Sequence, residues 1–268
     1  MTVASLALFL GLIGGATPSH AQEFPAAWPD ATELESFLKE AKVTERRKLG
    51  TGITNPDKLT LEMDGVVRHA VFKNVDGDFD SWRAEVAAYE MDKLLGLGMV
   101  PPTVERKVRG AMGCAQLWVE GRTLEKFTGT PHDLDAWRRQ VSLMWLFDDL
   151  VGNIDRHVNN VIVTEDFRLA LIDNSKTFRG GRELLNDLNR SGSSGTRAAY
   201  WQVPFDKNTE EYPTRYRAAV IDKIRSLTGK EVKATIGRYI RSYDRSLIFY
   251  RRELVLEQLE ELGDVVEP

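Results

Sequence analysis

The chain has 268 residues, of which 42% are hydrophobic and 28% are charged, and its formal net charge is −4. The composition is typical of a globular protein, and the length is enough for one large domain or for two lobes around a cleft. The small negative charge argues against a nucleic acid or an anionic membrane as the partner. A single cysteine, Cys114, excludes an intramolecular disulfide, and its apolar surroundings favour a buried, inert thiol.

Residues 1–21 differ from the rest of the chain. An apolar run from Leu6 to Ile13 precedes Ser19-His20-Ala21, a small-x-small pattern typical of signal-peptide cleavage. We therefore expect a signal peptide at residues 1–21, cleaved after Ala21, and a secreted or periplasmic protein. The first residues contain no Lys or Arg, so an uncleaved anchor or a misassigned start codon is the alternative. The run is short for a membrane span, and no later stretch is long and apolar enough to cross a bilayer.

Residues 22–47 are expected to be a linker followed by a short leading helix at 32–41. From residue 48 the pattern predicts strands at 59–63 and 67–73, joined by the turn Asp64-Gly65. A glycine-containing turn precedes them, and its backbone N–H groups and hydroxyls are placed to cover the phosphates of a nucleotide. A plain turn between strands is the alternative. The candidate phosphate contacts in this turn are Gly50, Thr51, Gly52 and Thr54.

Lys73 ends the second of these strands, and a helix is predicted at 81–95. A lone lysine at a strand end is commonly an edge residue or a side chain that extends into solvent. Here, however, Glu85 lies on the border of the apolar face of the following helix, where it can pair with Lys73. Glu90 is the competing partner. Strands at 104–108 and 113–119 and a long amphipathic helix at 132–150 follow.

The stretch from Gly152 to Asn160 carries the chemistry. It is a short polar loop between apolar segments, and a hairpin of two apolar strands, 160–163 and 169–173, follows it. The hairpin places Asn160 beside Asp173, and together they offer the hard oxygen ligands that Mg²⁺ takes beside substrate phosphates. Asp155 is spaced away from that pair and can orient or deprotonate an acceptor hydroxyl. The pattern predicts phosphoryl transfer.

The order Asp-Arg-His-x-x-Asn, a hairpin and then Ile-Asp-Asn resembles the atypical kinase branch of phosphatidylinositol kinases, HipA-type kinases and secretory-pathway kinases related to the Golgi casein kinase. Classical protein kinases carry His-Arg-Asp and Asp-Phe-Gly instead. The resemblance spans residues 48 to 255 and implies an α+β, bilobal protein-kinase-like fold. Its N-lobe, 48–118, is rich in β-strands, and its C-lobe, 119–262, is helical and contains the catalytic loop 152–160 and the metal-binding Asp173.

The resemblance also implies ATP as the substrate, with Mg²⁺ or Mn²⁺ held by Asn160 and Asp173. Lys73 would grip the nucleotide phosphates, and the family pattern selects Glu85 as its partner. The resemblance implies a separate role for each of the remaining candidates. Asp155 would act on the acceptor hydroxyl, and Arg156 and His157 would brace the loop or touch phosphate oxygens. Backbone groups of the hinge from Gln116 to Val119, Trp118 among them, would hydrogen-bond to adenine, and a plain hairpin is the alternative there.

Residues 175–205 have the composition of a long loop, which is typical of a lid or a substrate-docking segment. Helices are predicted at 216–227, 231–239 and 242–262, and Arg251-Arg252-Glu253 resembles the closing helix of the same kinase branch. The acceptor remains open among a protein, a sugar and a lipid. Adenylyl transfer, a pseudokinase that serves as an interaction module and a structural α+β protein are the alternative functions.

Overall fold

The structure, a computed structural model, describes residues 28, 30–50, 55–77, 80–182, 216–262 and 266–267. The predicted signal peptide, 1–21, lies outside these residues. So do Thr51, Gly52 and Thr54 of the glycine-containing turn and positions 183–205 of the predicted long loop.

The first lobe is built on a five-stranded antiparallel sheet with the order β1-β2-β3-β5-β4. The strands are β1 (Lys42–Lys48), β2 (Asp57–Met63), β3 (Val66–Lys73), β4 (Thr103–Val108) and β5 (Ala111–Leu117). Alternating residues such as Leu59, Leu61 and Phe72 are buried against Phe37 and Leu38 of helix α1 (Ala31–Glu40). This packing explains the apolar alternation in the sequence.

Strand β1 corrects the predicted start of the first lobe. The sequence pattern predicted a β-rich region from residue 48, but β1 pairs with β2 from Lys42 onward and so extends the sheet. The strand reads Lys-Val-Thr-Glu-Arg-Arg-Lys and is largely exposed. It is an edge strand, and charged side chains on an edge remove the apolar alternation by which strands are recognised.

Helix α2 (Trp82–Leu95) connects the two lobes. Its N-terminus is capped by the Ser81 hydroxyl, which accepts from the Arg83 N–H, and it ends at Gly96 with a left-handed φ of 70°. The helix packs against β4 and β5 and also against α6 (Gly229–Ile236) of the second lobe. Small residues in its middle, among them Ala87 and Ala88, belong to the main core and allow this close contact.

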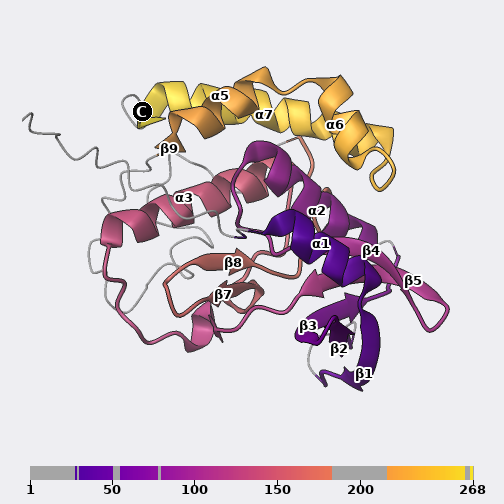
Figure 1. Ribbon diagram of the computed structural model, residues 1–268. Helices are drawn as coiled ribbons and strands as arrows, with labels where there is room; N and C mark the ends of the chain where they lie inside the picture. The colour runs from indigo at the N-terminus through magenta and orange to yellow at the C-terminus, as the bar shows by residue number, and fades with distance from the viewer. Residues whose placement is uncertain are drawn as a thin grey trace, which may run out of the picture.

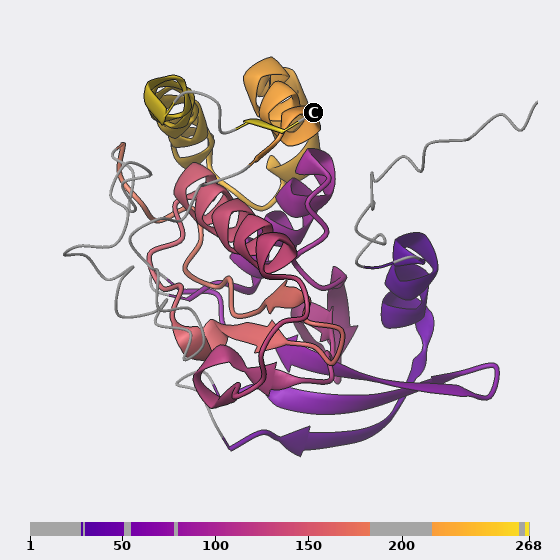
Figure 2. The same cartoon turned by 90° about the vertical axis from the view of Figure 1, so that its left-hand side faces the viewer.

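The second lobe contains helices α3 (Leu134–Val151), α5 (Ala218–Ser226), α6 and α7 (Ser242–Leu262). A small sheet with the order β6-β7-β8 accompanies them, formed by Arg122–Thr123, Val161–Val163 and Leu169–Leu171. The short 3-10 helices η1 (Leu124–Lys126) and η2 (Val158–Asn160) flank this sheet, and β9 (Tyr216–Arg217) pairs with β10 (Val266–Glu267). Figures 1 and 2 show these helices on one side and the five-stranded sheet on the other.

The prediction of an α+β fold with a β-rich first lobe and a helical second lobe is confirmed. The main predicted helices and strands are present, with ends that differ by a few residues. The predicted helix 231–239, for instance, begins at Gly229, because Thr228 and Glu231 form a capping box there. Among the described helices, none combines the length and the apolar character that a membrane crossing requires.

Candidate functional site

Residues of both lobes line a cleft of about 950 Å³. The first lobe contributes Lys73 from the end of β3, together with the chain that leaves β5. The second lobe contributes Asp155, Asn160 and Asp173 from the two loops that flank the β7-β8 hairpin. The structure therefore places Lys73, Asp155, Asn160 and Asp173 around one cavity, whereas Glu85 and Arg156 do not line it.

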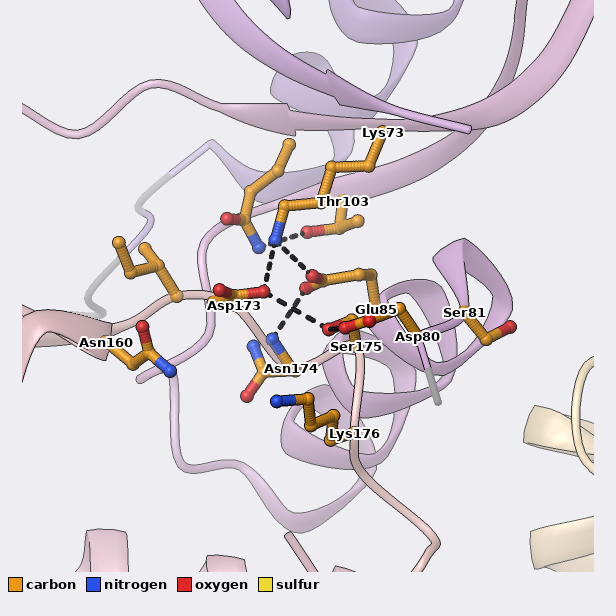
Figure 3. A network of polar contacts seen from close by, with 12 residues as sticks. Lys73, Asp80, Ser81, Glu85, Thr103, Asn160, Asp173, Asn174, Ser175 and Lys176 are labelled. Atoms are coloured by element: carbon orange, nitrogen blue, oxygen red, sulfur yellow. Dashed lines mark hydrogen bonds and ion pairs between the residues drawn. The ribbon is translucent and has the colours of Figure 1, made fainter. Parts of the chain in front are cut away.

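Lys73 makes two ion pairs in this cleft (Figure 3). Its Nζ lies 2.5 Å from Oε1 of Glu85 and 2.6 Å from Oδ1 of Asp173. The predicted pair with Glu85 is thus present, whereas the competing Glu90 pairs with Lys93 at 3.1 Å. Burial alone would lower the pKa of Lys73, but the two carboxylates raise it above its ordinary value, so the side chain is an ammonium ion.

Glu85 also connects the first lobe to the loop after β8. Its Oε2 accepts a hydrogen bond of 2.9 Å from the backbone N–H of Asn174. Burial raises the pKa of Glu85, although Lys73 opposes this change. At the start of the loop, Asp173 has a left-handed φ of 54°. Burial would raise the pKa of Asp173, but Lys73 overrides this effect and keeps the pKa below its ordinary value.

Asn160 and Asp173 lie next to each other, as the hairpin predicted, because the Ile172 N–H donates to the Asn160 carbonyl at 3.0 Å. The Asn160 amide Nδ2 donates to the Asp155 carbonyl at 3.0 Å. Within the described part of the chain, Asn160 Oδ1 and Asp173 Oδ2 accept no hydrogen bond from protein. Two hard oxygens that border a cleft fit Mg²⁺ or Mn²⁺, which takes its other ligands from phosphates and water.

No group of three or more His, Cys, Asp or Glu side chains among the described residues is placed to hold a metal ion. The pair of Asn160 and Asp173 is suited to a cation that arrives with a phosphate ligand.

Hydrogen bonds of the Asn153 side chain hold the loop around Asp155 in place. Asn153 accepts the Asp155 N–H through Oδ1 at 3.0 Å, and its Nδ2 donates to Oδ1 of the buried Asp148 at 3.0 Å. The carboxylate of Asp155 remains partly exposed in the cleft. Its Oδ2 accepts from the Lys176 ammonium at 2.8 Å, a contact that the sequence analysis did not anticipate.

Arg156 is buried beneath the loop. Its guanidinium donates to both oxygens of Asp148 at 2.9 and 3.1 Å, and to the Asn160 and Ile172 carbonyls at 2.8 Å each. A further hydrogen bond of 2.6 Å reaches Asn174 Oδ1. Of the two roles predicted for Arg156, these contacts correspond to bracing the loop. Asp148 was missed, although a charged residue in the apolar last turn of α3 is a detectable signal.

His157 forms the N-cap of η2, where its Nδ1 accepts the Asn159 N–H at 3.3 Å, and it lines the cleft. Gln116 and Trp118 line the cleft as well. The Gln116 side-chain amide, however, donates to the Thr103 hydroxyl at 3.0 Å, and the backbone N–H of Trp118 donates to the His69 carbonyl at 2.9 Å. Contacts of adenine with these two residues stay a prediction. They would have to involve groups other than the Gln116 side-chain amide and the Trp118 backbone N–H, which already donate to protein.

Two further residues complete the site. Asp80, just before α2, accepts a 2.8 Å hydrogen bond from the Ser175 hydroxyl, which also lies 3.3 Å from Oδ1 of Asp173. Asp80 and Lys176 both line the cleft. Sequence reasoning missed both, and only the position of Lys176, three residues after Asp173, offered a signal. Gly50 has a left-handed φ of 69°, and its neighbour Leu49 lines the cleft. The predicted contact of Gly50 with phosphate stays a prediction.

No family model and no curated protein matches this sequence. Solved structures do match it. Fam20 from hydra, solved with sugar, has a TM-score of 0.58 at 16% identity, over 88% of this chain and 92% of that chain. The Golgi casein kinase with Mn/ADP bound has a TM-score of 0.56 at 14% identity, over 87% of this chain and 76% of that one.

A third structure, the proinflammatory kinase CtkA of Helicobacter pylori, has a TM-score of 0.51 at 14% identity, over 85% of this chain and 95% of that one. The chain has an atypical kinase-like fold. This kinase-like fold confirms the resemblance to the branch of the Golgi casein kinase that the sequence indicated. At these identities the likeness concerns the fold, and the activity has to be argued from the residues of the cleft.

Proposed function

We propose that this chain is an exported, ATP-dependent phosphotransferase that moves the γ-phosphoryl group to a hydroxyl of a protein, a sugar or a lipid. The observation that carries the proposal is the contact of Lys73 with both Glu85 and Asp173, in a cleft also lined by Asn160 and Asp155. A cation that binds phosphate, a pair of metal ligands and a carboxylate base are the groups that phosphoryl transfer requires. The proposed export rests on residues 1–21.

In the proposed reaction, Lys73 binds the α- and β-phosphates while Glu85 holds its ammonium in place. Asn160 and Asp173 would hold a Mg²⁺ or Mn²⁺ ion, which would neutralise charge on the phosphates. Asp155 orients the acceptor hydroxyl and takes its proton. The acceptor oxygen bonds to the γ-phosphorus, the bond from that phosphorus to the bridging oxygen breaks, and ADP leaves. The nucleotide and metal found in the Golgi casein kinase structure support this choice of ligands.

Thermal unfolding of residues 22–268 with ATP and Mg²⁺ or Mn²⁺ tests the binding half of the proposal. A ligand at a hundred times its dissociation constant stabilises the folded state by about 2.7 kcal/mol. We expect a metal-dependent rise in the midpoint that is lost in Asp173→Ala and kept in Asp222→Ala, a control on the exposed face of α5. The absence of any shift with either metal would overturn the proposal.

Labelled ATP tests the transfer half. Asp155→Asn is expected to keep nucleotide binding and to lose transfer of label from the γ-position, because the acceptor proton then has no base. The same experiment separates the alternatives. Label transferred from the α-position would identify an adenylyl transferase, and nucleotide binding without transfer to any protein, sugar or lipid acceptor would identify an interaction module.

A further inference from the structure

Residues 174–178 form a turn, and Lys176 is the residue of this turn that lines the cleft. The Thr177 N–H donates to the Asn174 carbonyl at 3.1 Å, and the Phe178 N–H donates to the Val151 carbonyl at 2.9 Å. Ser175, Thr177 and Phe178 are buried on either side of Lys176. The backbone of the turn is therefore held in place, and the ammonium of Lys176 can move by rotation of its side chain.

Among the described residues, the hydrogen-bond and ion-pair partner of the Lys176 ammonium is Asp155. The 2.8 Å pair joins side chains that are 26% and 32% exposed, so water screens it and it contributes little stability. Lys73 differs, because its side chain is only 11% exposed and contacts two carboxylates. Of these two lysines of the cleft, Lys73 is therefore fixed, whereas Lys176 can exchange its partner at small cost.

The charges around Lys176 indicate which other partner its ammonium can take. Beyond Asp155, the negative charges of Asp80 and Asp173 also act on it and raise its pKa, so it is a cation at neutral pH. In the view of Figure 3, Lys73 and Lys176 lie on opposite sides of Asp173. In the proposed reaction, the α- and β-phosphates lie at Lys73 and the γ-phosphate lies at Asp155. The γ-phosphate would then also lie near Lys176, whose Nζ is 2.8 Å from Asp155 Oδ2.

We infer that Lys176 is a catalytic residue whose ammonium leaves Asp155 and binds the γ-phosphate oxygens of ATP. The inference rests on the proposed function and adds a residue to it. The exchange frees the Asp155 carboxylate to accept the proton of the acceptor hydroxyl. It also places a positive charge on the phosphoryl group that is transferred, where negative charge is shared among the equatorial oxygens. Lys176 keeps its proton throughout and makes no covalent bond.

Calorimetric titration with two nucleotides isolates the γ-phosphate. ADP and the non-hydrolysable β,γ-imido analogue of ATP are titrated with Mn²⁺ into the wild-type chain, Lys176→Met, Lys176→Arg and the control Lys230→Met, an exposed lysine on α6. In Lys176→Met we expect the affinity for the analogue to fall about tenfold or more, as for the loss of one charge-assisted hydrogen bond, while the affinity for ADP stays within about twofold. Lys176→Arg is expected to restore part of the difference, and Lys230→Met to show none.

The outcomes separate this inference from the function on which it rests. Equal loss of both affinities in Lys176→Met, or loss of neither, would overturn the inference while wild-type binding still supported the proposed function. A variant that binds both nucleotides normally yet turns over slowly would assign Lys176 to positioning Asp155 instead, and would also overturn it. Failure of the wild-type chain to bind either nucleotide with Mg²⁺ or Mn²⁺ would reject the proposed function itself. Thermal unfolding of each variant verifies that its fold is intact.

Discussion

At the scale of single residues, the second lobe depends on the guanidinium of Arg156. Its donors reach three separate parts of the chain: the end of α3, the loop before β7 and the loop after β8. Arginine suits this position because its planar fork presents several donors in fixed directions, which the single ammonium of lysine cannot do. Arg156 therefore places the candidate base Asp155 relative to the candidate metal ligands without itself lining the cleft.

The substitution Arg156→Lys tests this arrangement. It keeps the charge beside Asp148 but leaves buried acceptors without a donor, so we expect the free energy of unfolding to fall by about 2–4 kcal/mol. Urea denaturation measures the change. Arg225→Lys, in an exposed pair with Asp222, is the control and should change stability by less than about 0.5 kcal/mol. A similarly small effect at Arg156 would contradict its role as the organiser of both loops.

At the scale of elements, the end of α3 determines where the catalytic loop begins. Gly152 closes the helix with a left-handed φ of 66°, and a Cβ there would lie 2.9 Å from the guanidinium carbon of Arg251. That arginine is fully buried and donates to the Leu150, Gly180 and Gly181 carbonyls. Helix α7 thus contacts both the end of α3 and the chain that leaves the Asp173 loop.

Gly152→Ala is expected to destabilise the fold by more than about 1 kcal/mol, because the strained φ and the contact with Arg251 act together. Gly229→Ala is the matched control. Gly229 lies in the first turn of α6, and a Cβ there meets nothing within 4 Å. This change should be neutral or slightly stabilising. Chemical denaturation of both variants measures the difference, and equal effects would show that the left-handed turn carries no special cost.

The first turn of α6 offers a test by pH. Hydrogen bonds from Lys223 and then from Thr228 lower the pKa of Glu231 from 4.5 to about 2. Since the folded state holds the ionised carboxylate more tightly than the unfolded state does, this stabilisation is present above about pH 4.5 and is lost as the pH falls toward 2. Glu231→Gln should therefore be less stable than wild type at pH 7, with a gap that closes between pH 4.5 and 2. Urea denaturation across this range measures the gap, and a gap independent of pH would contradict the assignment.

At the scale of the whole molecule, the two lobes share helix α2. The Trp82 and Tyr239 rings meet edge to face with centroids 6.4 Å apart, and Arg238 pairs with Glu105 of β4. Because α2 also packs on α6, the position of Glu85 is determined by both lobes together. Packing of α2 on both lobes therefore positions the Lys73–Glu85 pair.

Cys114 can serve as a probe of the packing around Lys73. It is the only cysteine of the chain, and it is buried opposite Lys73 in the sheet. Burial raises its pKa well above the ordinary value, so the native thiol is unreactive. Its reaction with a thiol reagent should require opening of the first lobe. We expect slow labelling of the native chain, rapid labelling in denaturant, and further slowing by ATP with Mn²⁺. Native labelling as fast as that of the denatured chain would show that the first lobe is not stably closed.

The sequence by itself determined the order of the main elements, the bilobal fold and the central residues of the site. Apolar periodicity and glycine turns predicted the elements, and the spacing of Asp155, Asn160 and Asp173 around one hairpin predicted the centre of the site. The bilobal fold was implied by the family resemblance. A hairpin brings its two ends together whatever surrounds it, so Asn160 and Asp173 were placed correctly from the sequence. The choice of Glu85 over Glu90 came from the family pattern.

Only the tertiary structure decided the contacts between segments distant in the chain. The charged edge strand β1 carries no alternation, and its partner identifies it as a strand. Arg156 gathers groups from residues 148 to 174, and Lys176 meets Asp155 across 21 positions. Such pairings depend on how helices and sheets pack, because the same side chains in another packing would face water or different partners. The sequence therefore determined which groups the site contains, and the packing of the two lobes decided which of them touch.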